Sequence, residues 1–116
     1  MKSAETITEE AYKQALLSLD IEGKISENQR VWLKTHYDEG VVTTRKLAQV
    51  VGYKTYHPVN RWYGELGKLV AEKVGYTPPE KYTWLSTLVT FDKESSPYPM
   101  RLRPNVIEAL KGIEWV

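Results

Sequence analysis

The side chains of this chain best suited to binding chemistry lie around Pro58, where a predicted loop leads into a long predicted helix. Proline suits the first turn of a helix because the N–H that it lacks would have no partner there. Asn60 and Arg61 carry the donors and acceptors that match adenine and guanine edges, so both are candidates for base contacts. The residues that such a helix start presents to a DNA groove are Lys54, Thr55, Tyr56, His57, Asn60 and Arg61.

A second set of basic residues suits the phosphate backbone, which is contacted without regard to sequence. Its members lie before the long helix, within it and in a predicted strand near the C-terminus: Arg45, Lys46, Lys68, Arg101 and Arg103. The alternative is that these cations only keep a surface solvated, and that the two strand arginines keep an edge strand soluble. Tyr53, Tyr56 and Trp62 are candidates for stacking on bases or on a protein partner, or for packing beside the helix start.

Charge is unevenly distributed along the 116 residues, although the net charge is only +1. Residues 1–40 hold five basic and eight acidic groups, a net charge of −3. Residues 41–75 hold six basic and two acidic groups, a net charge of +4, and residues 76–116 balance at zero. A basic centre in a nearly neutral chain indicates one face that meets phosphate, and argues against an acidic mimic of DNA.

Catalytic motifs are absent from the sequence. There is no cysteine, so thiolate-bound zinc, iron–sulfur clusters and cysteine nucleophiles are excluded. His36 and His57 have no ligand-spaced partners, and no phosphate-loop or nucleophile-elbow motif occurs. We therefore expect no catalytic residue, metal or cofactor; an enzyme acting through His57 remains as a third hypothesis, which requires loss of turnover in His57→Ala.

Two capping boxes predict the helices of the acidic N-terminal part. The TITE sequence at residues 6–9 predicts a helix that ends near Asp20, and the SENQ sequence at residues 26–29 predicts one that ends at Gly40. In each box a threonine or serine hydroxyl and a glutamate or glutamine side chain accept hydrogen bonds from backbone N–H groups that have no partner within the helix.

The basic part begins with a short extended pair, Val41-Val42, followed by a helix capped by Thr43 or Thr44 and closed by Gly52. The next helix runs from about Pro58 to Val74, and its Gly64 and Gly67 suggest that another element packs against the backbone there. The connection of six residues exceeds the 3–4 of a tight helix-turn-helix. It shortens if the second helix begins near Thr55.

The C-terminal third predicts a β-hairpin and a short helix. Residues 82–91 are rich in aromatic and β-branched types and predict a strand, residues 92–97 a loop, and residues 98–103 a returning strand. A helix over 105–111 follows, and residues 113–116 add a last strand or pack on the core. This order predicts an α+β, mainly helical, winged helix-turn-helix-like single domain over residues 1–116, with the loop as its wing.

The segment from residue 41 to 116 resembles a family of small domains of bacteria and their phages, found alone or beside HNH-type nuclease and restriction modules. The most specific parts of the resemblance are Gly52-Tyr53-Lys54, Val59-Asn60, Tyr63-Gly64, Leu66-Gly67 and Arg103-Pro104. The resemblance implies a DNA-associated accessory role in defence or mobile-element biology. Nuclease activity does not carry over, because the chain has no HNH metal signature.

Two functions follow as expectations. The first is non-enzymatic binding of duplex DNA through the two sets of residues above. The second is a protein-interaction module, such as a phage-encoded inhibitor, similar in action to an anti-CRISPR protein, that binds a host nuclease or defence complex through residues 53–63. No stretch is apolar enough to span a membrane, so we expect a cytoplasmic protein; the oligomeric state stays open.

Overall fold

The computed structural model describes residues 4–78, 84–91 and 99–116. These form a mainly helical structure with one small antiparallel sheet, as the sequence predicted for the fold class. The helices are α1 (Glu9–Ile21), α2 (Glu27–Glu39), α3 (Thr44–Val50), α4 (His57–Val74) and α5 (Pro104–Gly112), with short 3₁₀ segments η1 (Ala4–Thr6) and η2 (Trp84–Thr87). The strands are β1 (Val41–Val42), β2 (Val89–Phe91) and β3 (Met100–Leu102).

The sheet places β3 between β1 and β2, with both neighbours antiparallel to it. Val41 is opposite Arg101 on one side, and Thr90 is opposite the same arginine on the other. The predicted hairpin is therefore confirmed, with the short pair after α2 as a third strand. The predicted loop over 92–97, and with it the wing, lies outside the described residues.

The predicted strand over 82–91 is wrong in its first half, of which residues 82 and 83 are not described. Residues 84–87 form η2, and the Thr87 hydroxyl closes this turn by donating to the Trp84 carbonyl at 2.7 Å. Leu85, Ser86 and Thr87 are buried. Packing of this turn against α4 overrides the preference of its residues for extended structure.

The start of α1 also differs from the prediction. Thr8 is the capping residue, accepting from the Ala11 amide at 3.1 Å, and Thr6 belongs to η1. The TITE sequence contains two threonines, and the second makes the cap, after the buried Ile7 that follows η1. The SENQ box at α2 is confirmed in both directions, with Ser26 and Gln29 each accepting from the other's amide.

The two helices of the predicted helix-turn-helix are joined by Val51–Tyr56, so the connection has six residues. Thr43 caps α3 by accepting from the Lys46 amide, and Gly52 follows it with φ +84°. The α4 helix begins at His57 and not near Thr55, with Pro58 in its first turn. The connection is therefore longer than that of the tight motif.

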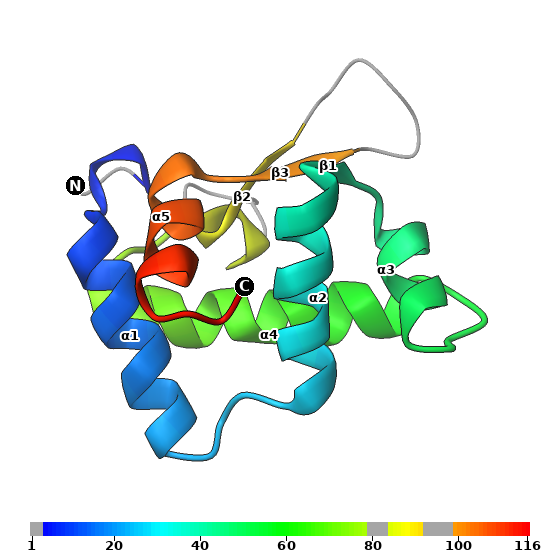
Figure 1. The fold of residues 1–116 in the computed structure, drawn as a ribbon, viewed down its shortest axis with the longest axis horizontal. Coiled ribbons are helices and arrows are strands. Elements are labelled where there is room, and N and C mark those ends of the chain that lie inside the picture. Colours follow the sequence, from blue (N-terminus) through cyan, green and yellow to red (C-terminus); the bar gives the residue numbers. More distant parts are fainter. Residues whose placement is uncertain (1–3, 79–83, 92–98) are drawn as a thin grey trace.

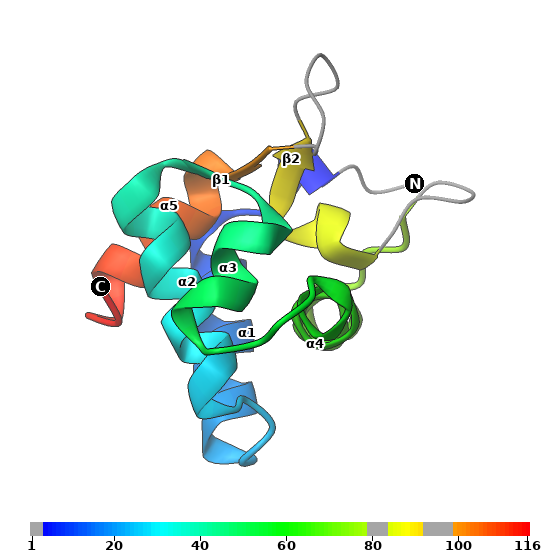
Figure 2. The same cartoon turned by 90° about the vertical axis from the view of Figure 1, so that its right-hand side faces the viewer.

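Helix α4 lies against most of the fold and carries one long buried face (Figure 1). Its buried residues are Val59, Tyr63, Leu66, Gly67, Val70, Ala71 and Val74. Viewed from its N-terminal end, the helix runs beneath η2, with α3 beside it (Figure 2). The stripe of apolar residues predicted for this helix is thus the face on which α1, α2, α3 and η2 meet.

The C-terminal residues 113–116 form no strand and pack on the core, the second of the two predicted outcomes. The guanidinium of Arg30 on α2 lies 3.8 Å from the centre of the Trp115 ring, which fastens this end to α2. None of the described helices is both long and apolar enough to cross a membrane.

Candidate nucleic-acid interface

The basic residues of the described chain divide into two groups by their ion pairs. One group has carboxylate partners at N–O distances from 2.6 to 3.8 Å: Lys13, Lys24, Arg30, Lys34, Lys73 and Lys111. Within residues 4–78, 84–91 and 99–116, a second group is exposed and has no carboxylate partner: Arg45, Lys46, Lys54, Arg61, Lys68 and Arg101. The half-exposed Arg103 has no ion pair there either. All members of the second group belong to the predicted DNA-contacting set, and all are exposed.

Helix α3 and the connection after it bring three of these cations to one end of the molecule. Arg45 and Lys46 lie in the first turn of α3, where the Thr43 cap fixes the start of the helix. Lys54 lies in the connection between α3 and α4 together with the exposed Thr55. These segments and the start of α4 lie at the right-hand end of Figure 1 and face the viewer in Figure 2.

The exposed face of α4 carries the rest of the helical candidates. His57, Arg61, Gly64 and Lys68 follow one another at intervals of four, three and four residues, which places them in one row along the helix. The three side chains of this row are exposed, whereas Gly64 is partly exposed and lies one turn from the buried Gly67. Asn60 is exposed beside them. The guanidinium of Arg61 lies 4.7 Å from the centre of the Trp62 ring, and its N–H groups have no carboxylate partner in the described chain.

The tyrosine before α4 adds an aromatic surface to this end. Tyr56 is 41% exposed, and its ring centre lies 4.5 Å from that of His57, which is also exposed. The predicted groove-facing residues from 54 to 61 thus come from one short segment at the α3–α4 junction, and their side chains reach solvent together.

The two strand arginines have different environments. Arg101 is exposed on the outer face of β3, between the buried Met100 and Leu102. Arg103 is only half-exposed, and its Nε donates to the Ser86 carbonyl at 2.9 Å. Arg101 is therefore free to meet a phosphate, whereas Arg103 also holds η2 against the start of α5.

A buried hydrogen-bonded histidine, whose partners the sequence did not reveal, fixes α4 to α2 and the sheet. His36 Nε2 lies 2.8 Å from the Met100 carbonyl, and Nδ1 lies 2.9 Å from the Tyr63 hydroxyl. Because a carbonyl only accepts, Nε2 carries the proton and the Tyr63 hydroxyl donates to Nδ1. Burial lowers the pKa of His36 to about 4 and raises that of Tyr63. The histidine thus joins α2, α4 and β3 through hydrogen bonds.

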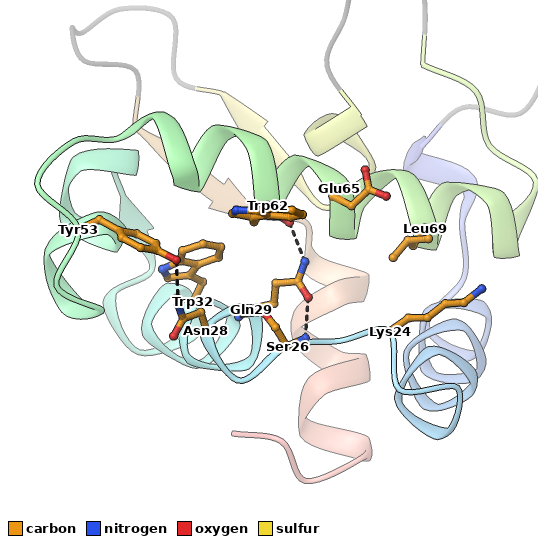
Figure 3. Close-up of a pocket in the computed structure, with 9 residues that line it drawn as sticks. All are labelled: Lys24, Ser26, Asn28, Gln29, Trp32, Tyr53, Trp62, Glu65 and Leu69. Atoms are coloured by element: carbon orange, nitrogen blue, oxygen red, sulfur yellow. Dashed lines mark hydrogen bonds between the residues drawn. The ribbon is translucent and has the colours of Figure 1, made fainter.

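A pocket of about 550 Å³ lies on another face of α4, between that helix and the start of α2 (Figure 3). The rings of Tyr53, Trp32 and Trp62 gather at one end, and Lys24 and Leu69 lie at the other. Gln29 fastens the wall by donating to the Trp62 carbonyl at 2.8 Å, and Asn28 donates to the Tyr53 hydroxyl at 3.1 Å. Sequence spacing identified two of these aromatics but not the pocket, because its walls come from separate segments.

No cluster of three or more potential metal-ligating side chains occurs in the described ranges. Hydrogen bonds from Lys73, Ser18 and Lys24 lower the pKa of Glu22 to about 2. This carboxyl belongs to an exposed ion-pair cluster between the end of α1 and the end of α4.

Comparison of the chain with family models, with curated proteins and with solved structures gives no match.

Proposed function

We propose that this chain is a non-enzymatic DNA-binding protein of the winged-helix type, which contacts duplex DNA through the exposed face of α4, the start of α3 and the outer face of β3. The predicted base contacts are Asn60 and Arg61, with Lys54 and His57 beside them. The predicted backbone contacts are Arg45, Lys46, Lys68, Arg101 and Arg103.

The observation that carries this proposal is the separation of paired from unpaired cations. An exposed lysine or arginine with a carboxylate beside it has its field partly cancelled, so it attracts phosphate less. The six exposed cations without such a partner lie on α3, the α3–α4 connection, α4 and β3, and the half-exposed Arg103 directly follows β3. Four of the six paired cations lie on α1, on α2 or between them, and the other two, Lys73 and Lys111, lie on α4 and α5.

The order of elements supports the winged-helix form of the proposal. A helix, a short strand, two helices and a hairpin follow one another in α2, β1, α3, α4, β2 and β3, the order expected for that fold. In this proposal the long helix after the α3–α4 connection serves as the recognition helix, and its start lies with α3 at one end of the molecule (Figure 1).

A pair of matched double variants tests the proposal. Arg61→Gln with Lys68→Gln removes two unpaired cations from α4, whereas Lys34→Gln with Lys111→Gln removes two paired ones from other helices. Both change the net charge equally. In fluorescence anisotropy with a labelled random duplex, the first variant is expected to bind at least tenfold more weakly than the wild type, and the second within about twofold. Equal losses in both variants contradict the proposal.

The pocket of Figure 3 favours a second function, binding of a protein partner. Trp62 is 44% exposed at its rim, and exposed tryptophan beside an apolar pocket is typical of an interface anchor. This supports the hypothesis of an inhibitor that binds a host nuclease or defence complex.

Capture from a bacterial lysate tests the second function. A protein retained by the wild type and lost with Trp62→Ala or Tyr56→Ala, but kept by Lys54→Glu with Arg61→Glu, supports the partner hypothesis. If the captured protein is lost only with the charge-reversed variant, the result contradicts the partner hypothesis and favours nucleic acid as the ligand.

A further inference from the structure

Two glycines lie inside α4 for different reasons. An ideal Cβ at Gly67 would overlap the Trp84 carbonyl oxygen and lie 3.1 Å from the Leu85 Cα, so η2 packs directly on the helix backbone there. This confirms for Gly67 the close packing that the sequence predicted. At Gly64 the prediction is wrong for the described residues, none of which has an atom within 4 Å of an ideal Cβ there.

The described fold therefore gives no reason for glycine at residue 64. Its φ is not positive, so no left-handed conformation requires it. A glycine in a helix interior is less stable than alanine because its backbone loses more conformational freedom on folding. Glycine also permits the close approach of a ligand to the backbone, and this partly exposed residue has open space among the described residues where a side chain would lie.

The neighbours of Gly64 indicate what approaches it. Arg61 precedes it by one turn and Lys68 follows it by one turn on the same face, about 10 Å apart along the helix axis. Neither has a carboxylate partner among the described residues. Glu65 and Glu72 follow Arg61 and Lys68 by one turn without an ion pair to either of them. A stretch of backbone without a side chain, between two cations that no carboxylate contacts, fits a polyanion that packs on the helix itself.

We propose that Gly64 is the point at which α4 comes closest to duplex DNA, with the DNA surface in van der Waals contact with the helix backbone and Arg61 and Lys68 on phosphates at either side. This inference rests on the proposed DNA-binding function and adds a position that sets the depth of docking. A side chain at residue 64 would hold the helix away from the DNA and lengthen both phosphate contacts.

A graded series at residue 64 tests the inference, because its predicted effects on stability and binding have opposite signs. Gly64→Ala is expected to raise the Tm by a few degrees and to weaken binding to a labelled random duplex several-fold. Gly64→Leu is expected to weaken binding more than tenfold while remaining folded. Gln14→Leu, at an exposed residue of α1 outside the cationic surface, is the size-matched control and is expected to bind like the wild type.

The outcomes separate the inference from the function on which it rests. If the wild type binds DNA and both residue-64 variants bind equally well, the inference is overturned and the proposed function stands. A lower Tm for Gly64→Ala also overturns the inference, since it shows that the fold itself needs glycine there. If the wild type binds no duplex at low salt, the proposed function fails, and the inference with it.

Discussion

At the scale of single residues, the buried His36 makes the stability of this fold sensitive to pH. The imidazole is held neutral between the Met100 carbonyl and the Tyr63 hydroxyl, and burial lowers its pKa to about 4. The unfolded chain takes up the proton near pH 6.5, whereas the folded chain does so only near pH 4. Stability is therefore full above pH 6.5 and falls as pH decreases toward 4.

We expect the free energy of unfolding to decrease by about 2 to 3 kcal/mol between pH 7 and pH 4.5 because of this histidine. Urea titrations at the two pH values measure the change. Glu22, whose pKa is lowered to about 2, adds a further loss of unfolding free energy below about pH 4.5. The loss between pH 7 and pH 4.5 is therefore assigned to His36. His57→Gln is the control and should keep the pH dependence. If His36→Gln loses as much unfolding free energy between pH 7 and pH 4.5 as the wild type, the assignment of this loss to His36 is contradicted.

Gly67 gives a second prediction at this scale. Gly67→Ala forces a methyl group onto the Trp84 carbonyl, so we expect it to destabilise the fold by about 1 to 3 kcal/mol, as measured by thermal unfolding. A variant as stable as the wild type would show that η2 moves away at little cost. The expected change in stability is opposite in sign to that expected for Gly64→Ala, three residues earlier in the same helix.

At the scale of elements, the two arginines at β3 and its junction with α5 have different expected roles: Arg101 binds DNA, whereas Arg103 also stabilises the fold. Arg103→Gln loses the hydrogen bond from Nε to the Ser86 carbonyl and is expected to cost about 1 kcal/mol in stability. Arg101→Gln touches no described side-chain partner, so we expect unchanged stability and several-fold weaker DNA binding. Denaturation and anisotropy on both variants check the two effects, and a stability loss for Arg101→Gln would contradict the assignment.

The elements that sequence predicted well are those fixed by local signals. The Ser26 box, the Thr43 cap, the Gly52 stop and the apolar stripe of α4 are all properties of a few neighbouring residues. The strand predicted over residues 84–87 was wrong because its residues are buried against α4, a contact that local preference cannot anticipate. The position of the α1 cap failed because two threonines of one motif competed for it.

At the scale of the whole molecule, the candidate site is only partly readable from the sequence. The basic character of residues 41–75 was visible, and so was the polar segment before α4. What the sequence did not contain is which cations are paired, since Lys73 on α4 reaches Glu22 from 51 residues away. The pocket and the His36 network likewise join segments far apart in the chain.

The most direct test of the central claim is the salt dependence of duplex binding by the wild-type protein. Anisotropy of a labelled random duplex, titrated at salt concentrations from about 50 to 200 mM, gives the number of phosphates neutralised, because log K falls by about 0.9 per phosphate for each decade of salt. With six unpaired cations, we predict a slope of about −3 to −5. Binding that does not change with salt, or no binding at the lowest concentration, would contradict the claim that this surface binds DNA.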